Sequence, residues 1–167
     1  KGEALVAGFT HLREQGVPLV VTMDGDGQHD PREIRKFLEA YRKTGLPIIV
    51  GNRMATPETM PFVRRYTNQF MSWLLCRMMG AFVPDTQCGY RLIRADVMPD
   101  VTSTRESGFA AESELLLHAA DRHIRIGSVR ITTIYGTGHS TIQPIRDALR
   151  FFGMLWRYRR ERKRHRT

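Results

Sequence analysis

The chain has 167 residues, of which 41% are hydrophobic and 26% are charged, and its formal net charge at pH 7 is +9. This length and composition predict one globular domain with a sizeable core. No apolar run approaches the roughly 20 residues that a membrane-spanning helix needs. Two isolated cysteines, Cys76 and Cys88, favour a reducing compartment over a disulfide framework.

The positive charge is concentrated at one end of the chain. Residues 157–167 hold seven Arg and Lys side chains against one Glu, whereas the rest of the chain holds 19 basic and 16 acidic side chains. We therefore expect a domain over residues 1–156 and a basic tail over residues 157–167. Such a tail suits an anionic membrane surface, a nucleic acid or a disordered, solubilising end. The side chains just before it also suit a membrane headgroup interface: Phe151, Phe152, Leu155 and Trp156.

Helical and extended patterns alternate along the chain, which predicts an α/β fold with a mostly parallel sheet. Helices are expected over residues 3–15, 31–45, 62–79, 112–123 and 145–158. Strands are expected over residues 19–21, 46–50, 90–93 and 124–134. Because the chain opens directly on a helix with Leu5, Phe9 and Leu12 on one stripe, we also expect an N-terminal truncation that has removed at least one strand.

An acidic turn follows the first predicted strand. The branched, apolar run of residues 19–21 is typical of a strand that is buried on both faces of a sheet. It is followed by Asp24 and Asp26, which alternate with glycines, and then by Asp30 and Pro31, a helix N-cap with proline at the first helical position. The acids thus lie at the carboxyl end of a strand, where open α/β sheets bind ligands.

The residue types of this turn suit a hard divalent cation. The carboxylates of Asp24 and Asp26, with the amide oxygen of Gln28, are ligands typical of Mg²⁺ or Mn²⁺. These ions commonly bridge a protein carboxylate to substrate phosphates. The alternative interpretation is an acidic surface turn that only caps the next helix.

Together with four other stretches, this turn resembles the family 2 glycosyltransferases, in the branch that is similar to dolichol-phosphate mannosyltransferase and other polyprenyl-phosphate sugar transferases. The five stretches occur in this order: residues 21–31, 51–53, 64–68, 85–91 and 142–150. The resemblance implies a GT-A type fold, which is a nucleotide-binding α/β sandwich. The family's opening strand is expected to be missing from this chain.

The resemblance also implies roles for individual residues. It assigns Asp24 and Asp26 to the nucleotide-sugar donor, and Asp26 with Gln28 to a Mg²⁺ or Mn²⁺ ion that neutralises the departing diphosphate. It assigns four residues to the acceptor phosphate: Arg53, Arg64, Asn68 and Asp85. A guanidinium group suits that role because its planar fork binds phosphate through two hydrogen bonds. The alternative for each Arg is a solvated surface charge.

No residue is named as the general base: Glu112 is a candidate, its alternative role is to stabilise the dipole of the helix that it opens, and the pattern around it departs from the family. Family members that glycosylate hydroxyls usually have a Glu-Asp pair here, whereas this chain has Glu112 followed by Ser113. A phosphate monoester is already ionised at neutral pH and needs no base. The departure therefore favours a phosphate acceptor. The last loop also lacks two cations common in relatives, for which His139 and Arg146 are candidate replacements.

The sequence therefore predicts an enzyme: inverting, metal-dependent transfer of a hexosyl unit from a nucleotide sugar to polyprenyl phosphate, in the synthesis of cell-envelope glycan. We expect it to be cytoplasmic, bound peripherally at the inner face of the membrane, with no nucleic-acid partner. The first alternative is a family 2 transferase that acts on a hydroxyl of a glycan or small molecule. A remote alternative is a nucleic-acid-binding domain that uses the basic tail.

Overall fold

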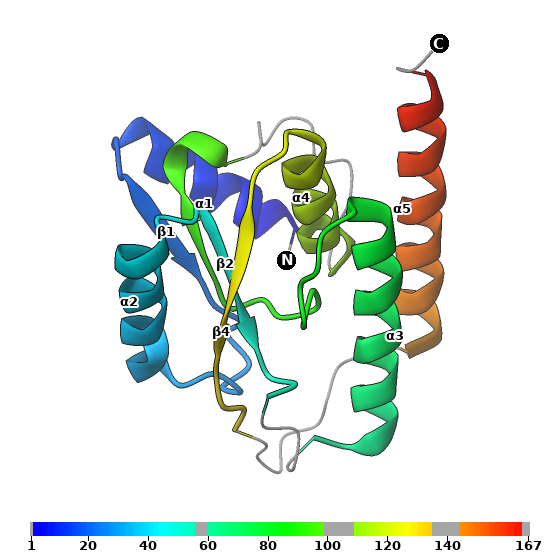
Figure 1. The fold of residues 1–167 in the computed structure, drawn as a ribbon, viewed down its shortest axis with the longest axis horizontal. Helices are drawn as coiled ribbons and strands as arrows, with labels where there is room; N and C mark the ends of the chain where they lie inside the picture. The colour runs from blue at the N-terminus through cyan, green and yellow to red at the C-terminus, as the bar shows by residue number, and fades with distance from the viewer. Residues whose placement is uncertain (1, 56–59, 99–108, 135–143, 165–167) are drawn as a thin grey trace.

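The computed structural model describes residues 2–55, 60–98, 109–134 and 144–164 (Figure 1). The α-helices are α1 (Gly2–Glu14), α2 (Ile34–Thr44), α3 (Phe62–Met79), α4 (Phe109–Asp121) and α5 (Pro144–Arg164). The strands are β1 (Leu19–Thr22), β2 (Ile48–Asn52), β3 (Arg91–Arg94) and β4 (Ile126–Arg130). Two short 3₁₀ helices are η1 (Pro31–Glu33) and η3 (Ala95–Val97).

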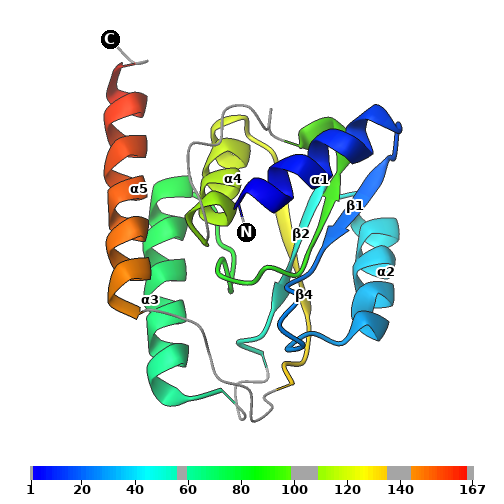
Figure 2. The ribbon, with the colours of Figure 1, turned by 180° about the vertical axis from the view of Figure 1, so that it is seen from behind.

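The helices lie on both sides of a central sheet. Helix α2 packs on one face against strands β2, β3 and β4. Helices α1 and α4 pack against each other on the opposite side, and α3 and α5 lie beyond α4, side by side in both views (Figures 1 and 2). A hydrogen bond from the Arg162 guanidinium to the Met78 carbonyl, 3.1 Å long, joins α5 to the end of α3.

The sheet has the strand order β1-β3-β2-β4, and its pairing corrects the expectation of a mostly parallel sheet. Strand β3 runs antiparallel to both β1 and β2, and only the pair β2–β4 is parallel. The sheet is mixed because β3 enters between two strands that precede it in the chain and runs opposite to them. Strands β1, β2 and β4 nevertheless all run in the same direction, so their carboxyl ends meet at one edge.

Strand β1 was expected to be buried on both faces, and this is also wrong. Within the described part of the chain β1 pairs only with β3, at the end of the sheet. Of its four residues only Val20 is buried, whereas Leu19, Val21 and Thr22 are half-buried.

The helix patterns are confirmed by the core. Phe9 of α1 is buried, with Leu5 and Leu12 packed beside it, and the inward face of α4 contributes Leu115 and Leu116. Helix α2 ends at Gly45, whose φ of 62° is the left-handed conformation that glycine adopts freely. Helix α3 has the predicted bounds.

Helix α5 is longer than predicted, since it continues past Tyr158 to Arg164 and carries most of the basic tail. Of the apolar side chains expected at a membrane interface, Phe151 and Leu155 are instead buried in the core, because they lie on the face of α5 that packs on α4. Phe152 and Trp156 are exposed. Among the described residues, no helix combines the length and the apolar character that crossing a membrane requires.

Candidate active site

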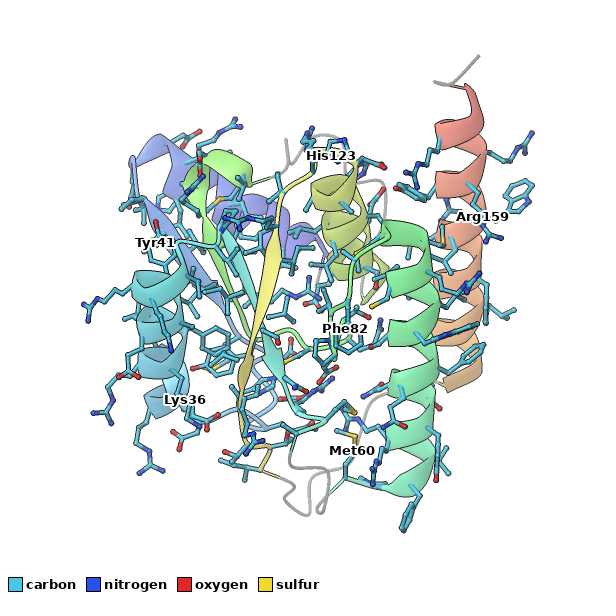
Figure 3. The ribbon with its side chains drawn as sticks, viewed as in Figure 1. Lys36, Tyr41, Met60, Phe82, His123 and Arg159 are labelled. Atoms are coloured by element: carbon cyan, nitrogen blue, oxygen red, sulfur yellow. The ribbon has the colours of Figure 1, made fainter. Side chains whose placement is uncertain are left out.

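The candidate site lies at the edge of the sheet where strands β1, β2 and β4 end and β3 begins. Four segments meet there: the acidic turn after β1 (residues 23–30), residue 53 after β2, the loop of residues 85–90 that leads into β3, and residues 131–134 after β4. Figure 3 labels Lys36 of α2 and Met60 before α3 on the two sides of this edge.

The carboxylate of Asp24 is turned into the protein. Its Oδ2 lies 3.8 Å from Nε2 of His29, and the carboxylate packs directly against Gly89 of the loop before β3. The Thr22 hydroxyl donates a 2.9 Å hydrogen bond to the Gly89 carbonyl, which ties the end of β1 to the same loop. The Asp24 side chain is 17% exposed, so it retains limited access to a ligand.

Asp26, by contrast, is exposed at the tip of the turn. Its Oδ1 accepts a 3.0 Å hydrogen bond from the backbone N–H of Gln28, which shapes the turn. The Gln28 carbonyl in turn accepts from the Ile134 N–H at 3.0 Å, so the turn is held to the chain after β4. The structure therefore places Asp26 at the exposed tip of the turn, in contact with the backbone of Gln28, while Asp24 faces inward.

Asp30 caps the next helical segment, as the sequence predicts. Its Oδ1 accepts a 2.9 Å hydrogen bond from the Arg32 N–H, and Pro31 occupies the first turn of η1, which leads into α2. The Arg32 guanidinium donates to the same carboxylate, and this contact, with the backbone hydrogen bond, lowers the pKa of Asp30. This acid therefore serves the helix and is set apart from the ligand side of the turn.

The donor set around Asp26 fits a divalent cation held together with a substrate. Among the described residues, no group of three or more His, Cys, Asp or Glu side chains could hold a metal ion on its own. Mg²⁺, however, is usually held by one or two carboxylates together with substrate phosphates and water. The exposed Asp26 and the half-buried Gln28 have side-chain oxygens of that kind.

Arg53 and Asp85 form a buried ion pair. The guanidinium Nε donates to Asp85 Oδ2 at 2.7 Å and Nη2 donates to Oδ1 at 2.9 Å, and the Arg53 backbone N–H adds a 3.2 Å hydrogen bond. The two residues are only 4% and 1% exposed, so the surface-charge interpretation of Arg53 is wrong. Asp85 thus fixes the plane of the Arg53 guanidinium at the end of β2.

Arg91 joins the loop of residues 85–90 to the start of α4. Its guanidinium donates to the carbonyls of Thr86, Cys88 and Glu112 at 2.9, 2.8 and 2.7 Å. The Glu112 carboxylate lies 3.8 Å from Arg91 Nη2 and is buried. The carboxylate of Glu112, the candidate base, therefore lies next to the Arg91 guanidinium, which already donates hydrogen bonds to three backbone carbonyls.

Arg64 and Asn68 lie one turn apart on α3 and are half-buried. Helical spacing puts them on the same side of α3 as the fully buried Leu75, and opposite to the exposed Phe62 and Tyr66. Arg64 and Asn68, which were both predicted to bind the acceptor, therefore lie on the side of α3 that faces the protein. They belong to the first two turns of this helix, shortly after Met60. His139 lies outside the described residues, as does the side chain of Arg146.

Two residues of this edge, Glu33 and His29, were given no role in the sequence analysis. Glu33 is buried, and its carboxylate accepts from the backbone N–H and the hydroxyl of Thr132, both at 3.1 Å, which ties η1 to the chain after β4. His29 is buried between the acidic turn and the ring of Tyr90, and its Nδ1 has no hydrogen-bond partner among the described residues. An acidic residue in the first turn of a helix is usually explained by its favourable interaction with the helix dipole, so nothing in the sequence indicated that Glu33 binds Thr132.

Comparison with known sequences identifies the family to which this α/β fold belongs. The model of the family described as "Glycosyl transferase family 2" matches residues 1–100, and the chain belongs to that family. The family and the α/β fold class that the sequence predicts are confirmed, apart from the mostly parallel sheet that the strand pairing corrects.

Several curated relatives are named as transferases that use lipid phosphates. The chain is 30% identical to the UDP-N-acetylglucosamine–dolichyl-phosphate N-acetylglucosaminyltransferase of Methanococcus voltae, over 80% of this chain and 55% of the relative. It is 30% identical to the undecaprenyl-phosphate mannosyltransferase of Micrococcus luteus, over 80% and 56%. It is 33% identical to the dolichyl-phosphate hexose transferase of Haloferax volcanii, over 76% and 55%. The chain thus spans about half the length of these relatives.

The fold is also similar to a solved structure. Glucosyl-3-phosphoglycerate synthase from Mycobacterium tuberculosis, in complex with phosphoglyceric acid, matches 95% of this chain and 54% of its own with a TM-score of 0.63. The sequence identity is 18%, so the likeness concerns the fold.

Proposed function

We propose that this protein transfers a hexosyl unit from a nucleotide sugar to polyprenyl phosphate, with inversion at the anomeric carbon and with a divalent cation. Membership of family 2 supports glycosyl transfer, and the names of the relatives support a lipid-phosphate acceptor. The structural observation that carries the proposal is the acidic turn at the common edge of three strands, with a fixed guanidinium beside it.

On the donor side, Asp26 and Gln28 hold the cation and Asp24 contacts the nucleotide sugar. A bound Mg²⁺ or Mn²⁺ supplies a Lewis acid for the negative charge of the departing nucleoside diphosphate. The exposure of Asp26 supports its role, because a cation shared with a substrate must be reachable from solvent. The inward carboxylate of Asp24 supports a fixed position against which one part of the donor is oriented.

On the acceptor side, Arg53, Arg64, Asn68 and Asp85 form the phosphate site. Asp85 acts through Arg53, because its two hydrogen bonds orient the guanidinium. Preorganised donors of this kind stabilise charge without reorganising during the reaction. Arg64 and Asn68, on the inward side of α3, provide the second half of the site.

No general base is required for this acceptor. The phosphate oxygen that attacks the anomeric carbon is already ionised, and the bond to the nucleoside diphosphate breaks as the new bond forms on the opposite face of the sugar. The position of Glu112, buried 3.8 Å from Arg91, supports a structural role for this carboxylate. Transfer to a hydroxyl remains the alternative, and it would need Glu112 as the base.

A row of exposed aromatic side chains supports peripheral contact with the inner face of a membrane. Phe62, Tyr66, Phe70 and Trp73 follow one another at helical spacing on the outer side of α3, and each is more than half exposed. The Arg77 guanidinium lies 5.7 Å from the centre of the Trp73 ring. An aromatic stripe with arginine at its end is typical of helices in a lipid headgroup layer.

Helix α5 repeats the same pattern. Leu149, Phe152 and Trp156 are exposed on one side, and the Arg160 guanidinium lies 4.5 Å from the centre of the Trp156 ring. The basic residues that follow add attraction to anionic lipids, at ~1 kcal/mol for each cation near the surface. A lipid-linked acceptor would then reach the site from the surface on which α3 lies.

The function is tested with the full-length protein reconstituted in vesicles that contain either polyprenyl phosphate or the free polyprenol. We expect transfer only to the phosphate, loss of transfer on chelation of divalent cations, and a product whose anomeric configuration, measured by NMR, is opposite to that of the donor. Equal transfer to the free alcohol would replace the proposal by the hydroxyl alternative. Retained configuration, or full activity in chelator, would overturn the inverting or the metal-dependent part.

The metal ligand is tested by Asp26→Asn, with Glu39→Gln on the exposed side of α2 as the matched control. We expect Asp26→Asn to abolish the Mn²⁺ dependence of nucleotide-sugar binding in calorimetric titration, while the control keeps it. If nucleotide-sugar binding depends on Mn²⁺ equally in both variants, Asp26 is not a ligand of the cation.

Membrane contact is tested with nitroxide labels at Phe70→Cys on α3 and Arg42→Cys on α2. We expect the label at position 70 to be shielded from a water-soluble relaxation agent and accessible to oxygen, and the label at position 42 to behave in the opposite way. Two equally water-exposed labels would exclude α3 as a membrane surface.

A further inference from the structure

The space beside Gly89 is filled by the carboxylate of Asp24. A Cβ atom added to Gly89 would lie 2.5 Å from Asp24 Oδ1 and 2.6 Å from Oδ2. Favourable non-bonded contacts lie at about 3.5–4.0 Å, so the two groups cannot occupy these positions together. Gly89 is not among the glycines with positive φ, so its backbone conformation is open to any residue. Glycine is therefore needed here for space alone.

The loop that carries Gly89 cannot easily move away from Asp24. The Thr22 hydroxyl holds the Gly89 carbonyl, and the Gly51 N–H donates to the Tyr90 carbonyl at 2.9 Å. On the other side, the Arg91 guanidinium holds two carbonyls of the same loop and one of α4. A methyl group at position 89 would therefore displace the carboxylate, which turns about its own side-chain bonds, before it displaced the loop.

The Asp24 carboxylate has a second neighbour in His29, whose Nε2 lies 3.8 Å from Asp24 Oδ2. The imidazole is buried against the ring of Tyr90, with the two ring centres 5.2 Å apart, and so it is also fixed in place. The Asp24 carboxylate is thus in contact with both Gly89 and the fixed imidazole of His29.

We propose that Gly89 is a positioning residue for donor binding: the absence of a side chain creates the slot that holds the Asp24 carboxylate toward the nucleotide sugar. This inference rests on the proposed role of Asp24 in donor binding. It assigns a donor-side effect to a residue of the loop that also supplies Asp85 to the acceptor side, and it predicts that Gly89 acts only through Asp24.

The test measures nucleotide-sugar affinity of the full-length protein by calorimetry with Mn²⁺. The probes are a panel of UDP-, GDP- and TDP-linked hexoses, and the panel member that the wild-type protein binds most tightly is used for every variant. We expect Gly89→Ala to weaken its binding by at least tenfold, as Asp24→Asn does. The double variant Gly89→Ala/Asp24→Asn should bind within twofold of Asp24→Asn, because the two changes remove the same contact.

Gly127→Ala is the matched control. Its Cβ would also meet a neighbour, at 2.7 Å, but that neighbour is the flexible tip of Leu46, which precedes β2, and Gly127 lies at the start of β4, away from the edge that carries the acidic turn. We expect this variant to bind within twofold of wild type even where its melting temperature falls. If Gly89→Ala fails to fold, Thr22→Val removes the hydrogen bond to the Gly89 carbonyl without adding bulk, and it should weaken binding two- to tenfold.

The outcomes separate the inference from the function on which it rests. Wild-type affinity of Gly89→Ala, additive losses in the double variant, or an equal loss in Gly127→Ala would each overturn the role of Gly89. If Gly89→Ala does not fold and Thr22→Val binds the nucleotide sugar with wild-type affinity, the role of Gly89 is also overturned. Wild-type affinity of Asp24→Asn would instead overturn the donor role of Asp24, and binding of no panel member would overturn the donor side of the proposed function.

Discussion

The buried pair of Arg53 and Asp85 should make the fold sensitive to the loss of a single charge. In Asp85→Asn the shape of the side chain is kept, but the buried Arg53 guanidinium loses the carboxylate charge with which it forms two hydrogen bonds. Breaking a buried pair by removing one partner costs about 3–5 kcal/mol. Asp85 accepts three hydrogen bonds from Arg53, and two of them are charge-assisted, which supports a value in that range.

This cost is measured by urea and thermal unfolding of the full-length protein. For a domain of this size, 1 kcal/mol corresponds to roughly 2–4 °C in melting temperature, so a fall of about 6–20 °C is expected. The double variant Arg53→Met/Asp85→Leu, which removes both charges, should recover most of the loss. It should lose acceptor binding, since the phosphate site loses its guanidinium.

A surface pair of the same type serves as the control. Arg94 and Asp96 also form two hydrogen bonds, but their side chains are 38% and 59% exposed, so water replaces either partner. Asp96→Asn should leave the unfolding free energy close to wild type. If Asp85→Asn is no more damaging than Asp96→Asn, the buried pair does not constrain the end of β2 and the reasoning above fails.

Two further predictions concern the acceptor and the protonation of the core. Arg64→Ala should raise the apparent KM for polyprenyl phosphate by roughly 10- to 150-fold, which corresponds to the loss of one charge-assisted hydrogen bond, and should leave donor affinity unchanged. The control is Arg42→Ala on the exposed side of α2, which should leave this KM unchanged. Steady-state kinetics of both variants test the prediction. Burial raises the pKa of the Cys88 thiol to about 12, above its usual value near 9, so the unfolded chain loses this proton first as pH rises. The folded state should therefore lose stability between about pH 9 and 12, and Cys88→Ala should reduce that loss in urea titrations across this range.

The local features of this fold could be predicted from the sequence, because they depend on residues close together in the chain. The bounds of α3, the end of α2 at Gly45 and the cap at Asp30 all follow from side-chain spacing and from single residue types. The position of the acidic turn at the end of β1 could be predicted for the same reason.

The features that failed depend on contacts between distant segments. The direction of β3 is set by its insertion between β1 and β2, which no local pattern records. Arg53 finds its partner 32 residues further along the chain, so its burial could not be read from the residues around it. Phe151 and Leu155 have the composition of an interfacial helix, and only the packing of α5 on α4 assigns them to the core.

The loop of residues 85–90 gives the two halves of the site a common support. Asp85 orients the arginine proposed for the acceptor, and Gly89, four residues later, leaves room for the acid proposed for the donor. Since Arg91 fixes the carbonyls between them, a shift at one end of the loop is passed on to the other. We therefore expect that the choice of sugar and the choice of acceptor cannot diverge independently in evolution, and that relatives with a new acceptor will carry paired changes in this loop and in the acidic turn.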